Sequence, residues 1–155
     1  MRLWDYAVAV YGRPEVRAAC LALQDDHGQC VSLLLWRAWA VAEGRALSEA
    51  DLAAALAVAR AWEAQVSAPL RSARRALRLP PPEIGEARRA ELHDRVLAIE
   101  LEAERALLDA LEARTPPATT LPGDLTAALT ALAAAWRPGA PASAITRLIL
   151  ALPSA

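Results

Sequence analysis

The sequence predicts an all-α protein, a single-domain helical bundle with a long antiparallel helical hairpin and a C-terminal amphipathic helical extension. Apolar residues recur every three to four positions through most of the chain, which is the spacing of one helix face. No segment shows the alternation of a half-buried strand. Hydrophobic residues fill 55% of the 155 positions, and many of them are Ala, the residue with the highest helix propensity. A chain of this length can bury a core without disulfides or metals.

Three helices are predicted in the first part of the chain. The first two cover residues 4–11 and 14–26, since a Pro suits the first turn of a helix and a Gly suits the position after its end. Gly28 supplies the second stop. From residues 29–44 the chain is apolar nearly all round, which is typical of the buried central helix of a bundle.

A long helical hairpin is predicted next. Ser48 and Asp51 resemble a capping box that opens its first helix. Pro69 lies inside the helical pattern, so the helix must kink or restart there. We expect this helix to end at the prolines 80–82. The second helix is expected from about Glu83 to Arg114, and its predicted buried stripe is Leu92, Val96, Ile99, Ala103, Ala106, Leu107 and Leu111.

The predicted organisation is a bundle core over residues 1–114, a Pro- and Thr-rich linker over 115–123 and C-terminal helical segments over 124–155. The last part carries two apolar stripes, one from Leu125 to Trp136 and one from Ile145 to Leu152. Both stripes need a surface to cover them. The sequence leaves open whether they pack on the core or on another molecule.

Charge and hydropathy give an expected location. The net charge is −1 and the pI about 6.1, so no overall field attracts nucleic acid. Asp5 and Tyr6 interrupt the start where a signal peptide needs an apolar run, and we expect a cytoplasmic protein. The most apolar stretch, residues 31–42, is shorter than the roughly 20 residues of a membrane span, so no span is predicted.

The turn after the second predicted helix gathers the most reactive residue types. We expect Cys20 and Cys30 to be packing residues and predict no metal, no cofactor and no catalytic residue. Asp25 and Asp26 close a helix at the end where the dipole disfavours negative charge. With Gly28 they form a structural corner, in which an Asp is expected to cap the next helix. The alternatives are a ligand-binding role or, less favoured, an enzyme that uses both acids with His27.

The sharpest polar feature is a basic stripe at helical spacing, with no acidic residue between its members: Arg71, Arg74, Arg75 and Arg78. The facing helix is rich in acidic residues, so pairing across the hairpin is the first interpretation. A phosphate-bearing or acidic partner is the alternative. Sequence-specific nucleic-acid binding is not expected, because the helix after the Gly28 turn is too apolar to face a groove.

Aromatic residues are spread over several predicted helices: Trp4, Tyr11, Trp36, Trp39 and Trp62. Large aromatics at helical spacing usually fill a bundle interior. The alternative is that they line a pocket for a small apolar ligand.

The segment Leu23-Gln24-Asp25-Asp26-His27-Gly28, followed by Val31-Ser32-Leu33-Leu34-Leu35-Trp36, resembles a family of small proteobacterial proteins known only as a domain of unknown function. The aromatic first helix, Trp62 and the Pro69-Leu70-Arg71 segment are similar too. The family pattern has Asn where this chain has Ser32. The resemblance covers the first half to two thirds of the chain, and it implies a fold without an activity, substrate or catalytic residue.

The sequence therefore favours a non-enzymatic helical interaction module, an adaptor or regulator that binds another protein or a second copy of itself. This hypothesis rests on the many amphipathic helices of a chain that has no recognisable catalytic residues. The competing hypothesis is a carrier of a small apolar ligand held among the Trp side chains.

Overall fold

The computed structural model describes residues 1–79, 83–119 and 123–153, and in these ranges the chain is all-α, as predicted. The predicted end of the first hairpin helix at prolines 80–82 lies outside them, as does the part of the linker at 120–122. In chain order the elements are α1 (Leu3–Tyr11), α2 (Pro14–His27), α3 (Val31–Ala42), α4 (Glu49–Trp62), the π-helix η1 (Glu63–Ser67), α5 (Ala68–Ala76), α6 (Glu86–Ala113), α7 (Leu125–Trp136) and α8 (Ala142–Ala151).

The first three helices follow the predicted signals closely. Pro14 begins α2, and Gly28 ends it in the left-handed conformation with φ 61°. The N–H groups of Gly28 and Gln29 then donate to the carbonyls of Gln24 and Leu23, and the Gly28 bond is that of the αL type of helix cap. The sharp turn sends the chain directly into α3. The side chains of α3 from Leu33 to Trp36 and from Ala38 to Val41 are buried, so α3 is the central helix.

Two long antiparallel helical rods form the predicted hairpin. The Ser48 hydroxyl and the Asp51 carboxylate exchange the hydrogen bonds of a capping box at the start of α4. The chain stays helical through η1 into α5, with Pro69 in the first turn of α5. Pro69 has no backbone N–H, so it cannot donate the hydrogen bond of a continuous helix. The π-helix η1 lies directly before this break. The returning rod is α6, whose 28 residues span about 42 Å.

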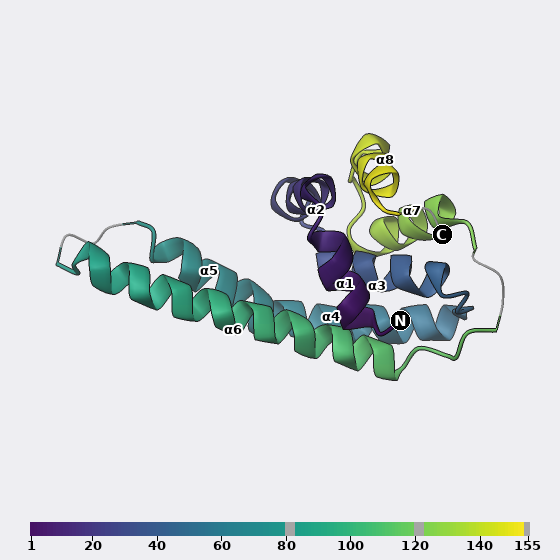
Figure 1. The fold of residues 1–155 in the computed structure, drawn as a ribbon, viewed down its shortest axis with the longest axis horizontal. Helices are drawn as coiled ribbons and strands as arrows, with labels where there is room; N and C mark the ends of the chain where they lie inside the picture. Colours follow the sequence, from purple (N-terminus) through teal and green to yellow (C-terminus); the bar gives the residue numbers. More distant parts are fainter. Residues whose placement is uncertain (80–82, 120–122, 154–155) are drawn as a thin grey trace.

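The hairpin reaches well beyond the rest of the molecule (Figure 1). We call the part outside the body "the arm", defined as α5 together with α6 from Glu86 to Leu101. The body consists of α1 to α4, α7, α8 and the remainder of α6. α5 packs against α6 and η1, and it contains no buried residue.

The C-terminal segments pack on the body. α7 lies along α3, and α8 lies along α2 and α7. Leu129, Ile145 and Leu148 join Leu34 and Trp39 in a single hydrophobic core. The question that the sequence left open is answered, since both apolar stripes cover helices of this same chain.

The predicted stripe of α6 is wrong at its middle. Ile99 is 50% exposed and Ala106 is exposed, whereas the neighbouring Glu100 is buried. α1 and α3 cover α6 only toward its C-terminal end, as the arm in Figure 1 makes plain. In the arm α6 packs against α5, and there the acidic Glu100 pairs with Arg74 of α5.

Candidate interaction arm and polar junction

The four Arg side chains of the predicted stripe have four different surroundings. Arg71 donates to both carboxylate oxygens of Glu63 in η1, over 2.9–3.0 Å. Arg74 pairs with the buried Glu100 across the hairpin. Both guanidinium groups are mostly shielded, with 19% and 18% of their side chains exposed. These two residues are therefore internal structural groups and offer little surface to a partner.

The other two Arg residues lie nearer the solvent. Arg75 pairs with Asp25 of α2 over 3.0 Å, and both side chains are about half exposed. Arg78 donates from Nε to Nε2 of His93 over 3.2 Å. The prediction of acidic pairing across the hairpin is confirmed at Arg74 only, since the acidic partners of Arg71 and Arg75 belong to other elements.

The corner after α2 is built differently from the prediction. The N-cap residue of α3 is Cys30, and no side chain caps that end, so the expected capping by Asp25 or Asp26 is wrong. Asp25 instead binds Arg75, and Asp26 is exposed. Neither carboxylate caps the start of α3, because both belong to the last turns of α2 and the chain reverses after them at Gly28.

Gly28 is a close-packed position as well as a turn. A Cβ atom there would lie 2.2 Å from a guanidinium nitrogen of Arg137. Trp136 at the end of α7 donates its indole N–H to the Gly28 carbonyl over 3.0 Å. The corner is therefore a docking point for the C-terminal segments.

The aromatic residues belong to the core and its edges. Trp36 and Trp39 are buried in α3 and donate to the Thr115 hydroxyl over 2.8 Å and to the Met1 carbonyl over 2.9 Å. Trp62 donates to the Ala103 carbonyl over 3.0 Å. Trp4 and Tyr11 lie half-buried on α1, each below an Arg side chain. The indole N–H groups of Trp36, Trp39 and Trp62 thus bind segments that are distant in the sequence, as expected of amphipathic packing residues.

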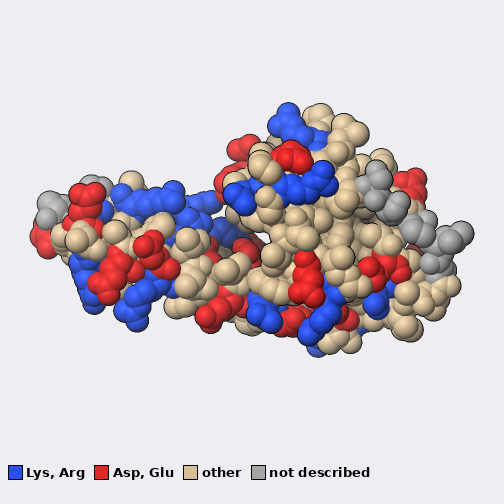
Figure 2. Space-filling view, viewed as in Figure 1, with Lys and Arg blue, Asp and Glu red and all other residues tan. Residues whose placement is uncertain are grey.

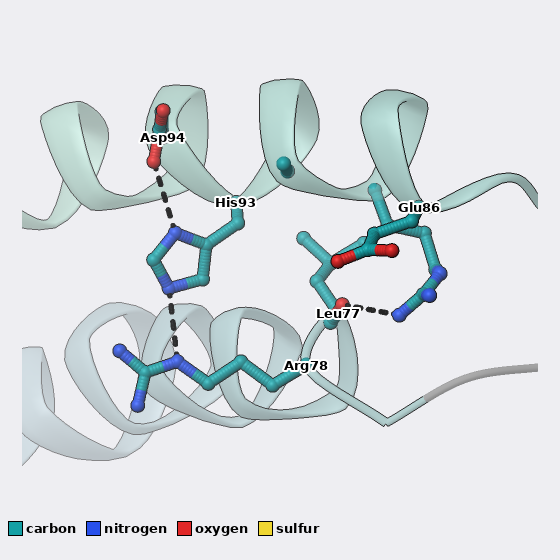
Figure 3. A pocket seen from close by; sticks show the side chains of 7 residues that line it. Leu77, Arg78, Glu86, His93 and Asp94 are labelled. Atoms are coloured by element: carbon teal, nitrogen blue, oxygen red, sulfur yellow. Dashed lines mark hydrogen bonds and ion pairs between the residues drawn. The ribbon is translucent and has the colours of Figure 1, made fainter.

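Among the described residues, three hollows are lined by other side chains than these aromatic residues. The hollow near the tip of the arm, of about 300 Å³, lies between α5 and α6 and is bordered by Arg78, Arg89 and His93. Figure 3 shows the His93 ring between Arg78 and Asp94. A second hollow of about 270 Å³ lies beside the Gly44 turn.

The third hollow is small and polar, and it lies where the arm leaves the body. We call it "the polar junction"; its side chains come from α2, α3, η1, α5 and α6, and its polar lining is Gln24, Cys30, Ser32, Glu63, Ser67, Arg71 and Glu104. Its volume is about 20 Å³. π-turns such as η1 occur frequently at functional sites, and here η1 supplies both Glu63 and Ser67.

Two ionisable groups of the junction are perturbed. Loss of hydration raises the pKa of the Glu104 carboxyl, Glu100 and Glu63 raise it further, and Arg71 and Arg74 lower it. Glu104 as a whole residue is exposed. Burial raises the pKa of the Cys30 thiol to about 12, so this thiol is protonated at neutral pH and is a poor nucleophile.

Sequence reasoning missed the polar junction, because its residues are scattered from position 24 to position 107. One signal was present: the predicted helix break at Pro69 fell close to the π-turn. The other partners are set by the packing of five elements. Within the described ranges no group of three or more His, Cys, Asp or Glu side chains is placed to hold a metal ion.

Comparison with family models gives one match, to the family described as "Protein of unknown function (DUF2390)", over residues 2–111. The chain belongs to the DUF2390 family. The DUF2390 match ends in the last turn of α6, so α7 and α8 lie beyond it although they complete the core. No curated protein and no solved structure matches the chain. None of the helices in the described part is long and apolar enough to cross a membrane.

Proposed function

We propose that this DUF2390 chain is a non-enzymatic interaction module, a cytoplasmic adaptor or regulator whose arm contacts another protein. The observation that carries the proposal is α5. This helix separates its apolar residues from its Arg residues, yet it has no buried residue. A helix of this kind normally gains its stability by burying its apolar face, so α5 is suited to a further contact.

The arm and the residues that join its two helices also expose large apolar side chains. They are Leu79, Ile84, Leu97, Ile99 and Leu101, with exposed fractions from 47% to 71%. Leu97 and Leu101 are four residues apart and share one side of α6. Single exposed apolar residues are ordinary on protein surfaces, but two that share one side of a helix, as Leu97 and Leu101 do, favour a contact surface.

Charge gives the arm a second recognition element. α5 and the residues after it up to Leu79 carry four Arg and no acidic residue, and basic side chains gather along the α5 edge in Figure 2. Arg75 and Arg78 are the exposed members. A partner surface with acidic residues around an apolar strip is complementary to this edge.

The apolar-carrier alternative receives no such support. The two most buried Trp side chains are enclosed by the core, and the hollows described above are lined by other residues than the five aromatic ones. We therefore place the contact on the arm.

The test compares the variant Leu97→Glu/Leu101→Glu in the arm with the variant Leu21→Glu in the body. Leu21 is 41% exposed, so it controls for added charge on a solvent-facing helix. Photo-crosslinking from a benzophenone side chain at position 99, followed by mass spectrometry, identifies the contacted protein or a second copy of this chain. Sedimentation velocity with that protein then measures binding.

We expect the arm variant to lose binding by about tenfold or more, since charged groups would be buried at the contact, while Leu21→Glu binds normally. Both variants should unfold at the wild-type temperature. Equal binding by the arm variant and the wild type would rule the arm out.

A further inference from the structure

The hollow beside the Gly44 turn is lined by more positive than negative charge. We call it "the Gly44 hollow"; it measures about 270 Å³, and its charged lining residues are Arg37, Arg45 and Asp124. It lies on the body, where the last turns of α3 meet the start of α7 (Figure 1). Among the described residues its lining therefore has one cation in excess.

Arg37 is a partly shielded cation without a counter-ion. No hydrogen bond and no ion pair joins its guanidinium to a described residue. Partial burial lowers the pKa of Arg37, and no neighbouring carboxylate raises it again. Removing a cation from water is unfavourable unless an anion lies close by. The Arg37 guanidinium is therefore available to an anion that enters the hollow.

Arg45 adds an independent sign of unused hydrogen-bonding capacity. Its guanidinium stacks on the Trp39 ring, 4.4 Å from the ring centre, and its Nη1 donates to the Pro116 carbonyl over 2.9 Å. Its Nε is one of two buried side-chain polar atoms that have no partner among the described residues. Buried polar atoms almost always have a partner. The two contacts of Arg45 fix a second positive charge at the edge of the hollow.

Asp124 does not neutralise these two cations. Its carboxylate caps α7 by accepting a hydrogen bond from the Ala127 N–H over 3.0 Å. It forms no ion pair with either Arg of the described hollow, and it is not among the causes that shift the pKa of Arg37. The acid of the hollow is therefore committed to its own helix.

Size and lining indicate which anion fits. A volume of about 270 Å³ lies just below the range of about 300–1,000 Å³ that holds drug-sized ligands, so the ligand is a small molecule. A planar carboxylate matches the planar guanidinium in geometry. One excess cation suits a single negative charge, whereas a phosphate dianion brings nearly two. Val41, Ala46 and Leu47 add an apolar wall for a short hydrocarbon chain.

We propose that the Gly44 hollow binds a small organic monocarboxylate, with the carboxylate on the Arg37 guanidinium and a short hydrocarbon chain against Val41 and Leu47. Arg45 contributes the second positive charge, held in place by Trp39 and by the Pro116 carbonyl. This site lies on the body and does not depend on the contact proposed for the arm.

The test is an NMR titration of the full ¹⁵N-labelled chain at pH 7 with sodium hexanoate. Hexanamide, sodium phosphate and sodium chloride at equal ionic strength are the controls. We expect saturable shifts of the backbone amides of Arg37, Arg45 and Leu47 with hexanoate only. Removal of the cation in Arg37→Gln should weaken binding by at least about tenfold. This variant should keep the fold, since the Arg37 guanidinium holds no described partner.

Arg147→Gln is the matched control variant, because Arg147 is exposed on α8, and it should bind like the wild type. Asp124→Asn gives a second variant that leaves Arg37 in place. Asn caps a helix about as well as Asp, so the loss of this acid should tighten hexanoate binding several-fold. Equal binding by Arg37→Gln and the wild type, or no gain in Asp124→Asn, would overturn the proposal. Shifts with hexanamide or phosphate as large as those with hexanoate would overturn the assignment of a carboxylate.

Discussion

The buried Arg74–Glu100 pair gives the sharpest test of how the hairpin is held together. Glu100 lies on α6 inside the arm with 10% of its side chain exposed, and Arg74 of α5 is its partner. One residue further along, Arg75 pairs with Asp25 in solvent, with 60% and 48% of the two side chains exposed. The variants Arg74→Ala and Arg75→Ala therefore remove the same side chain from one helix in two different environments.

The two variants should lose different amounts of unfolding free energy, by a factor of several. Arg74→Ala leaves a carboxylate buried without its cation, which typically costs about 3–5 kcal/mol. Arg75→Ala breaks an exposed pair that is worth about 0–1 kcal/mol. With a urea m-value of about 2 kcal/mol/M, the unfolding midpoint should fall by about 2 M for Arg74→Ala and by less than about 0.5 M for Arg75→Ala.

Urea titrations followed by far-ultraviolet circular dichroism and by Trp fluorescence measure both midpoints. The double variant Arg74→Met/Glu100→Met separates lost pairing from lost packing, and we expect it to recover most of the loss because no buried charge is left unpaired. Equal midpoints for Arg74→Ala and Arg75→Ala would refute the reasoning. A double variant as unstable as Arg74→Ala would show that the pair does more than cancel its own charges.

Three further outcomes follow from the structure. The raised pKa of Glu104 means that the native state holds this proton more tightly, so the contribution of Glu104 to the free energy of unfolding should fall as pH rises above about 4.5. Urea titrations of Glu104→Gln and the wild type across this pH range should therefore differ in slope, and equal slopes would contradict it. Burial raises the pKa of both Cys20 and Cys30 to about 12, so Ellman's reagent at neutral pH should label them only as fast as the chain unfolds, and rapid labelling of the native protein would argue against this packing. A chain ending at Arg114 should lose its near-ultraviolet circular dichroism and cooperative unfolding, because α7 and α8 no longer cover α3 and α2; a cooperative transition would show that the DUF2390 segment folds alone.

Local signals in the sequence account for most of the helix boundaries. Gly28 and the Ser48–Asp51 box lie where the chain turns or begins a helix, since caps and stops act through backbone groups within a few residues. The continuous apolar character of α3 likewise identified the central helix. The amide preference that the family resemblance suggested at Ser32 is met here by a hydroxyl that borders the polar junction.

Contacts between distant residues were beyond the reach of periodicity. Ile99 and Glu100 are neighbours in sequence. Only the packing of α5 against α6 decides that Glu100 is covered and Ile99 is not. Asp25 could be recognised as an unfavourable charge at a helix end, but its partner Arg75 lies 50 positions away.

What the sequence determined by itself is the all-α class, the order of the helices and the hairpin, because hydrogen bonds within a helix and the 3.6-residue period are local properties. What only the tertiary structure decided is how the charges are shared out. The Arg stripe becomes two shielded pairs and two exposed groups, and five elements bring Glu63, Arg71 and Glu104 to one place. Burial and pairing depend on which surfaces meet, and that is a property of the folded chain as a whole.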